Sequence, residues 1–169
     1  MKRILVLGPS GSGKSTFARK LAERLRLPWI CLDHYYWKPN WVETPKEEWR
    51  EVVASLISRS EWVMDGNYSK TLEMRIERAD TAIFLDVPRR VSFWRIFKRR
   101  ITNHGKVRLE LAEGCTEKID LDFLRWIWGY PSRTRPLVDR ILSENADSKT
   151  IVFLKGSKQA AEYLETVSN

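Results

Sequence analysis

Residues 2–16, KRILVLGPSGSGKST, decide the fold of this chain. Their first half is an uninterrupted apolar run, which is typical of a short strand buried on both faces of a parallel sheet. In the second half Gly8 and Gly13 are separated by four residues and a Lys-Ser pair follows, which fits the phosphate-binding (Walker A) template. Apolar residues at helical spacing come directly afterwards. The order strand, loop, helix predicts a binding site for a nucleoside triphosphate.

Each part of this loop has a physical role in binding ATP and Mg²⁺. The glycines let backbone N–H groups point inward at a polyphosphate, and the start of the helix adds partial positive charge. Lys14 is expected to neutralise the β- and γ-phosphates, and Ser15 to offer its hydroxyl to Mg²⁺. The alternative is a glycine-rich turn without a ligand. The nucleotide-contacting residues are predicted to be Gly8, Pro9, Ser10, Gly11, Ser12, Gly13, Lys14, Ser15 and Thr16.

Strand and helix signals alternate along the rest of the chain. Further strands are predicted at 29–33, 62–66, 81–87 and 150–154, and helices at 44–58, with Thr44 as N-cap, Pro45 in the first turn and Glu47 closing a capping box, and at 157–167. This alternation predicts a three-layer α/β/α fold with a five-stranded parallel sheet. Ligands of such sheets bind at the carboxyl ends of the strands. The strand ends there carry Gly8, Asp33, Asp65 and Asp86.

Length and charge limit the class of protein. With 169 residues, we expect a single domain spanning 1–169. The apolar runs are too short to span a bilayer or to form a signal sequence, so a cytoplasmic protein without membrane contact is expected. The net charge is +8, and residues 88–140 carry 13 Lys and Arg against 6 Asp and Glu. This basic segment either faces an anion or is a solvated surface.

Three motifs downstream of the loop resemble one known family. They are Asp65-Gly66 after the third predicted strand, Leu85-Asp86-Val87-Pro88 at the end of the fourth, and Arg95 followed by Arg99-Arg100. Over nearly its full length the chain resembles the adenylate-kinase-like branch of the P-loop NTPase fold. It looks most like the small bacterial group known as DNA topology modulation proteins, with which it shares DGNY and a tryptophan-rich region.

The resemblance implies roles for two of these motifs. Asp65 would hold Mg²⁺ together with Ser15, although a turn aspartate before Gly66 is the alternative. Arg95 and Arg99 lie on one helix face and would clamp the triphosphate at the start of a helical lid, about residues 95–140. A solvated basic face is the other interpretation. Arg133 and Arg135 are further candidates for this clamp, with a surface turn as the equal alternative.

The acceptor side is predicted around CLDHYYWKPNW, residues 31–41. Asp33, expected at the end of the second strand, would orient or deprotonate an acceptor hydroxyl. The resemblance departs from nucleoside monophosphate kinases after Asp65-Gly66, where an aromatic residue, a proline and a phosphate-binding arginine are replaced by Asn, Tyr and Ser. A nucleoside monophosphate acceptor is therefore in doubt. Ordinary core packing is the alternative for Trp37 and Trp41. The predicted acceptor-side residues are Asp33, His34, Tyr35, Trp37, Asp65, Asn67 and Tyr68.

Three functions fit these features to different degrees. The first is an ATP- and Mg²⁺-dependent kinase of a small acceptor (a nucleoside, a nucleotide or a hydroxylated metabolite), acting as a monomer or homodimer, with Lys14, Asp33, Arg95 and Arg99 as catalytic residues. The second is a nucleotide-dependent DNA- or RNA-associated regulator, which the basic segment and the tryptophans would suit. No nucleic-acid-binding signature is visible, so a nucleic-acid partner is not favoured. The third, a switch NTPase, lacks a guanine-selecting sequence.

Overall fold

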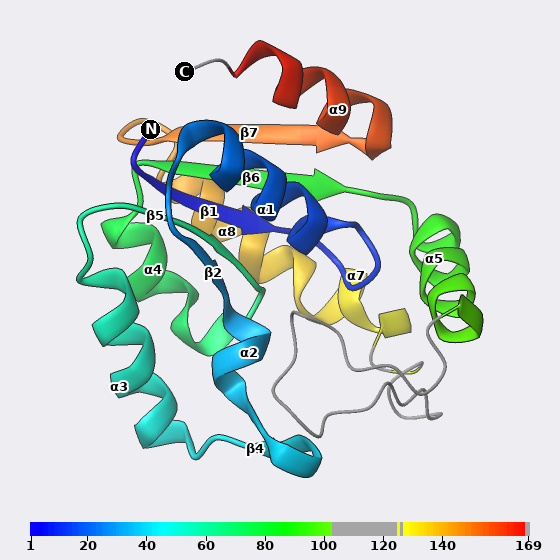
Figure 1. The fold of residues 1–169 in the computed structure, drawn as a ribbon, viewed down its shortest axis with the longest axis horizontal. Helices are drawn as coiled ribbons and strands as arrows, with labels where there is room; N and C mark the ends of the chain where they lie inside the picture. Colours follow the sequence, from blue (N-terminus) through cyan, green and yellow to red (C-terminus); the bar gives the residue numbers. More distant parts are fainter. Residues whose placement is uncertain (103–124, 126, 168–169) are drawn as a thin grey trace.

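A five-stranded parallel sheet organises the computed structural model, which describes residues 1–102, 125 and 127–167 (Figure 1). The strands run in the order β2-β5-β1-β6-β7, so the phosphate-binding loop leaves the central strand. Neighbouring strands are parallel throughout, with β1 paired to β5 and β6. The predicted fold class is confirmed. The strands are β1 (Arg3–Leu7), β2 (Trp29–Cys31), β5 (Trp62–Asp65), β6 (Thr81–Asp86) and β7 (Thr150–Lys155).

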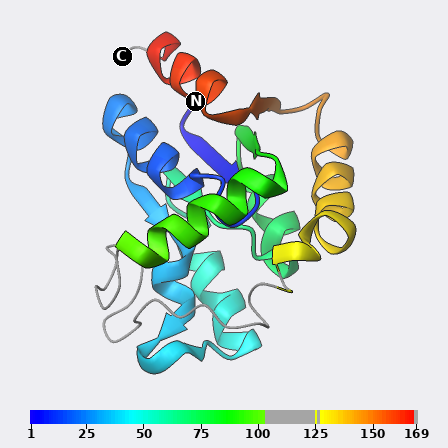
Figure 2. The same cartoon turned by 90° about the vertical axis from the view of Figure 1, so that its right-hand side faces the viewer.

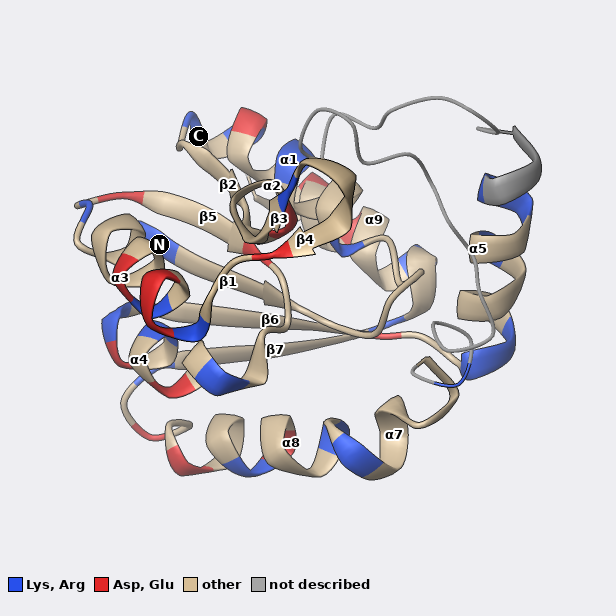
Figure 3. Ribbon diagram, turned by 90° about the horizontal axis from the view of Figure 1, so that it is seen from below, with Lys and Arg blue, Asp and Glu red and all other residues tan. Residues whose placement is uncertain are grey.

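Helices cover both faces of this sheet. Ile4 and Val6 of β1 pack with α1 (Lys14–Leu25) and α9 (Gly156–Thr166) on one face. The alternate residues Leu5 and Leu7 pack on the other face with α3 (Lys46–Ile57), α4 (Leu72–Arg78) and α8 (Arg135–Glu144). Figure 3 shows α8 and the short α7 (Tyr130–Arg133) on the side of the sheet opposite α1 and α9. Because β1 is apolar without alternation, it supplies side chains to both cores.

The carboxyl ends of the strands carry the remaining elements. Helix α5 (Arg89–Thr102) follows β6 and lies across this edge, in front of the end of β1 (Figure 2). On the β2 side, α2 (Leu32–Tyr36) leads to the antiparallel pair β3 (Trp37–Lys38) and β4 (Val42–Glu43), joined by the 3₁₀ turn η1 (Pro39–Trp41). A second 3₁₀ turn, η2 (Ser69–Thr71), precedes α4.

Two predictions about the β2 side are wrong. The strand expected at 29–33 ends at Cys31, because its partner β5 ends at Asp65, which is opposite Cys31 in the register. Asp33 therefore lies in the first turn of α2 and not in a strand. The capping box at Thr44 is also absent, since α3 begins after Pro45 and the Thr44 hydroxyl donates to the Tyr36 carbonyl at 2.6 Å.

The structure adds elements that the sequence pattern does not indicate, namely α2, α4 and the β3–β4 pair. Part of the predicted lid, residues 103–124 and 126, lies outside the described residues, as does the side chain of Arg100. Within the described part of the chain, no helix combines the length and the apolar character needed to span a membrane.

Candidate active site

The phosphate-binding loop encloses its site with backbone. Gly13 caps α1 with φ 90° and no side-chain cap, so the first N–H groups of the helix are left for a ligand. The Ser12 N–H donates to the Pro9 carbonyl at 3.1 Å and closes the turn. Gly11 has φ +77°, and a Cβ there would lie 2.6 Å from the Ser92 carbonyl oxygen of α5. The loop conformation therefore requires glycine at this position.

A hydroxyl and a carboxylate meet beside the start of α1. Ser15 Oγ donates to Asp65 Oδ2 at 2.6 Å, and Trp29 Nε1 donates to Asp65 Oδ1 at 2.8 Å. Asp65 is only 1% exposed. Burial raises the pKa of Asp65, while the charge of Lys14 and the two hydrogen bonds act in the opposite direction. Hard oxygen groups at this spacing fit Mg²⁺, so Ser15 and Asp65 are the residues that would hold this ion.

Among the arginines predicted to bind the triphosphate, the structure shows Arg95 in contact with the loop. Its Nη1 donates to the Ser12 carbonyl at 2.8 Å and lies 3.6 Å from a Cβ position on Gly13. Arg99 follows one turn later on α5 and is half-buried, and Arg133 is exposed at the end of α7. Their part in the anion clamp stays a prediction.

Arg135, the second arginine near the end of the basic segment, is engaged by carboxylates. It donates to Asp139 at 2.6 Å and to Asp86 at 3.0 Å, and it lies over the ring of Phe84 at 4.3 Å from the centroid. These contacts link α8 to the end of β6. An anion clamp built on Arg135 would have to break them, so its place in the structure is that of a cross-link between elements.

The loop after β5 reaches the phosphate-binding loop through Asn67. The Asn67 side chain donates to the Gly8 carbonyl at 2.7 Å and accepts from the Gly8 N–H at 3.2 Å. This two-bond contact pairs a side-chain amide with the backbone at the point where β1 ends. The sequence predicts that Asn67 faces the acceptor, but the described hydrogen bonds of its side chain are with the phosphate-binding loop.

Tyr68, the residue after Asn67 in the loop that follows β5, orients Asp33. The Tyr68 hydroxyl donates to Asp33 Oδ1 at 2.7 Å, and burial together with the charge of Asp33 raises the pKa of Tyr68. Tyr68 therefore keeps its proton and leaves Asp33 as an acceptor of hydrogen bonds. Its backbone has φ 29°, which is uncommon for a residue other than glycine.

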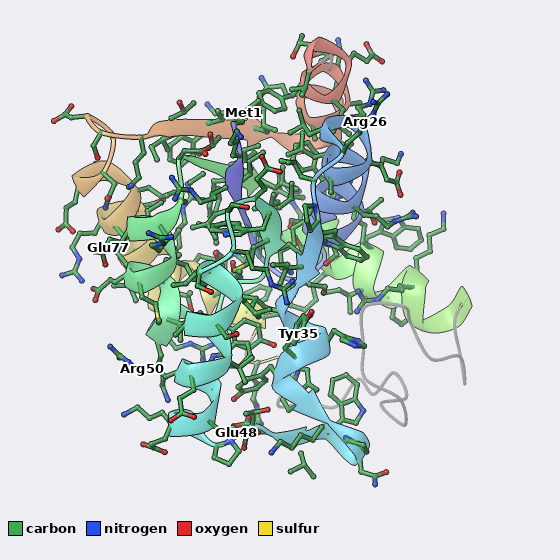
Figure 4. All side chains as sticks on the ribbon, turned by 60° about the vertical axis from the view of Figure 1, so that its left-hand side comes forward. Met1, Arg26, Tyr35, Glu48, Arg50 and Glu77 are labelled. Carbon is green, nitrogen blue, oxygen red and sulfur yellow. The ribbon has the colours of Figure 1, made fainter. Side chains whose placement is uncertain are left out.

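The aromatic residues near Asp33 form a connected set, because Tyr36 contacts Trp37 with ring centroids 4.9 Å apart. Tyr36, Trp49 and Tyr68 contact one another with ring centroids 4.7–5.0 Å apart and pack against the buried core. Trp37 and Trp41 are half-buried and contact each other at 5.2 Å. His34 and Tyr35 are exposed. Figure 4 shows Tyr35 on α2, beside α3, which carries Glu48 and Arg50.

Sequence reasoning missed two residues of this site. Trp29 at the start of β2 donates to Asp65, and Arg75 on α4 donates to the carbonyls of the loop after β5. No motif includes either position. The sequence pattern does not indicate α4, so no local signal singles out Arg75.

Comparison with known proteins shows the family of this chain. A family model described as an AAA domain matches residues 4–114, which is more than half of the chain and includes the phosphate-binding loop, Asp33 and Asp65. This chain belongs to the AAA domain family. In this AAA domain the matched region ends inside the segment that follows α5.

Several relatives and solved structures are similar to this chain over most of its length. The "Uncharacterized protein YqaC" of Bacillus subtilis is 25% identical over 146 residues, covering 85% of this chain and 81% of the relative. An adenylate kinase of Clostridium tetani is 24% identical, covering 98% of this chain and 96% of the relative. The structure of shikimate kinase from Acinetobacter baumannii in complex with shikimate matches with a TM-score of 0.63, at 17% identity, over 98% of this chain and 89% of that one. The last similarity shows the P-loop kinase fold.

Proposed function

We propose that this protein is an ATP-dependent kinase that transfers the γ-phosphate of ATP to the hydroxyl of a small molecule. The observation that carries the proposal is the 2.7 Å hydrogen bond between Tyr68 and Asp33, because Tyr68 belongs to the same loop that binds Gly8 through Asn67. An oriented carboxylate is thus connected to the phosphate-binding loop. A switch NTPase has no need for such a group on the β2 side, whereas a kinase needs it for the acceptor.

The residues of the chain divide the reaction between them. Lys14 and the loop N–H groups bind the β- and γ-phosphates, and Arg95 adds positive charge beside the loop. Ser15 and Asp65 would hold Mg²⁺, which neutralises charge on the phosphates when bound. As the acceptor oxygen forms its bond to phosphorus and the bond to the leaving ADP oxygen breaks, the hydroxyl proton passes to Asp33. Tyr68 keeps the Asp33 carboxylate in place during this step.

The finer assignments belong to the same proposal. We infer a single domain over residues 1–169, with a lid at about 95–140 in which Arg99 and Arg133 approach the phosphates when the site is loaded. His34, Tyr35 and Trp37 would contact the acceptor. Similarity to an adenylate kinase supports a small acceptor, which would be a nucleoside, a nucleotide or another hydroxylated metabolite. The protein would act as a monomer or homodimer in the cytoplasm.

A screen of phosphate acceptors tests the proposal. Purified protein is incubated with Mg²⁺·ATP and pools of nucleosides, nucleotides, sugars and other hydroxylated metabolites, and ADP release and a mass increase of one phosphoryl group are measured. The proposal expects an acceptor whose phosphorylation requires both Lys14 and Asp33. It fails if ADP release never depends on an added acceptor, or if the Lys14→Ala variant phosphorylates the same compound at the same rate.

One observation favours the second candidate function, a nucleotide-dependent DNA-associated regulator. Trp94 and Phe97 on α5 are 62% and 59% exposed, and Arg89 lies over the Trp128 ring at 4.9 Å from its centroid. Aromatic and arginine side chains of this kind can stack on unpaired bases. Binding of single-stranded DNA at several salt concentrations, with and without Mg²⁺·ATP, decides the point. Tight binding at physiological salt that is lost in Trp94→Ala would favour the regulator.

A further inference from the structure

One buried side chain holds the loop that joins the two halves of the candidate site. Arg75 on α4 is 0% exposed, and its guanidinium donates to the main-chain carbonyls of Gly66 at 2.9 Å and Tyr68 at 3.1 Å. It also donates to the carbonyls of Asn67 and, through Nε, of Thr71. Three consecutive carbonyls of the loop after β5 therefore converge on one planar cation.

This arrangement is costly to build into the interior of a protein. Burial lowers the pKa of Arg75 to about 9, and the acceptors of these hydrogen bonds are all backbone carbonyls. A buried charge is destabilising unless its donors are satisfied, and an apolar side chain would fill the same volume at lower cost. The planar fork of an arginine has one property that an apolar residue lacks, because it fixes the directions of several acceptors at once.

The carbonyls that Arg75 fixes belong to the residues that contact the two halves of the site. Asn67 makes two hydrogen bonds to the Gly8 backbone in the phosphate-binding loop, at 2.7 and 3.2 Å. Tyr68, held at φ 29°, places its hydroxyl 2.7 Å from Asp33. A rotation of the backbone at either residue would move its side chain away from its partner.

We propose that Arg75 is a positioning residue that couples the phosphate-binding loop to Asp33, acting through Asn67 on one side and through Tyr68 on the other. The assignment of Asp33 to the acceptor rests on the proposed kinase function. The coupling itself is a property of nucleotide binding and loop structure, so it can be measured without knowing the acceptor.

A double-mutant cycle on nucleotide affinity tests the coupling. Dissociation constants for Mg²⁺·ATP are measured for the wild type, Arg75→Lys, Asn67→Ala and the double variant, well below their unfolding temperatures. Lysine keeps the charge but cannot hold three carbonyls in a plane. Each single variant is expected to bind about tenfold more weakly, since about two hydrogen bonds are lost or misaligned. The double variant should be no more than about twofold weaker than the weaker single variant.

The matched control is Arg78→Lys on the same helix. Arg78 is exposed, and its Nε lies 3.5 Å from the Ile57 carbonyl, away from the loop after β5. This variant should bind Mg²⁺·ATP like the wild type. The proposal is overturned if Arg75→Lys folds and binds nucleotide with unchanged affinity, or if the losses of Arg75→Lys and Asn67→Ala multiply. A purely structural role of Arg75 would lower the melting temperature without that non-additivity.

Hydrogen exchange covers the case in which Arg75→Lys does not fold. Coupling is reciprocal, so saturating Mg²⁺·ATP should slow amide exchange at residues 66–71 of the wild type. In Asn67→Ala, measured at its own saturating nucleotide concentration, this additional protection should be lost. Equal protection in both proteins, or none in the wild type, contradicts the proposal.

The inference and the proposed function fail separately. A protein that shows the coupling but phosphorylates no acceptor would overturn the kinase assignment and leave the role of Arg75 intact. A protein that phosphorylates an acceptor while Arg75 and Asn67 act independently on nucleotide binding would overturn the inference alone.

Discussion

The phosphate-binding loop and the Asp33 side of the site are built by different means. The loop is made of backbone held in shape by glycines, with Gly11 and Gly13 at φ +77° and +90°. The Asp33 side is made of side chains from α2, α3 and the loop after β5, which contact one another across long stretches of sequence. The first kind of site is encoded within a few neighbouring residues, whereas the second depends on tertiary contacts. Variants can test how far this contrast holds.

The largest effect on the rate is expected from Lys14→Ala, in the phosphate-binding loop. Removing the cation that faces the phosphates should lower phosphotransfer by about 10⁴-fold or more, with the fold retained, because Lys14 is only half-buried and is not part of the cores. Circular dichroism and steady-state rates check both statements. Lys20→Ala, an exposed position on the same helix, serves as the control. Normal turnover by Lys14→Ala would remove the loop from the mechanism.

On the Asp33 side, which is made of side chains, Asp33→Asn should lower the rate of phosphotransfer by about 10²- to 10⁴-fold with little change in ATP affinity. The amide oxygen can still accept from Tyr68, so the shape is kept while the charge is lost. Asp65→Asn should instead weaken Mg²⁺ binding, and part of its loss should return at raised Mg²⁺. A Mg²⁺ titration of both variants measures the difference. If raised Mg²⁺ rescues Asp33→Asn and not Asp65→Asn, the two roles are exchanged.

The effect of Gly11→Ala on the free energy of unfolding tests whether the loop conformation requires glycine at this position. A Cβ at this position meets the Ser92 carbonyl at 2.6 Å in a positive-φ conformation, so unfolding free energy should fall by about 2–4 kcal/mol. Gly156→Ala is a matched control, because Gly156 has φ +75° but nothing within 4 Å of the added atom. It should cost about 1 kcal/mol, the conformational part alone. Equal losses in urea denaturation would show that the contact with α5 is not important for stability.

The smallest effect is expected from Tyr68→Phe. Losing one hydrogen bond to the Asp33 carboxylate should lower phosphotransfer by about tenfold and leave ATP affinity unchanged. Tyr36→Phe lies in the same ring cluster, but the hydroxyl of Tyr36 hydrogen bonds to Glu43, so its rate should stay close to that of the wild type. A rate for Tyr68→Phe equal to the wild type would mean that Asp33 is oriented by other contacts.

The same contrast explains which features could be predicted. The strands, their parallel pairing and the phosphate-binding loop follow from local apolar runs and glycine spacing, and these are enough to predict the fold class. The end of β2 could not be predicted, because it depends on where its neighbour β5 ends in the register. The contact of Asn67 with Gly8 joins residues 59 positions apart, and that of Tyr68 with Asp33 joins residues 35 apart. Neither separation leaves a periodic trace in the sequence.

The close approach of Gly11 to the Ser92 backbone also limits how α5 can move. At this contact the loop and the helix touch without an intervening side chain, and one turn further on Arg95 is tied to the Ser12 carbonyl. The first turns of α5 therefore travel with the phosphate-binding loop as one rigid piece. The contact also includes the buried Ile96, whose side chain lies close to Gly11, so any bending of α5 relative to the loop would have to occur beyond Ile96. The absence of a Cβ at Gly11 thus allows the close contact that holds the first turns of α5 against the loop.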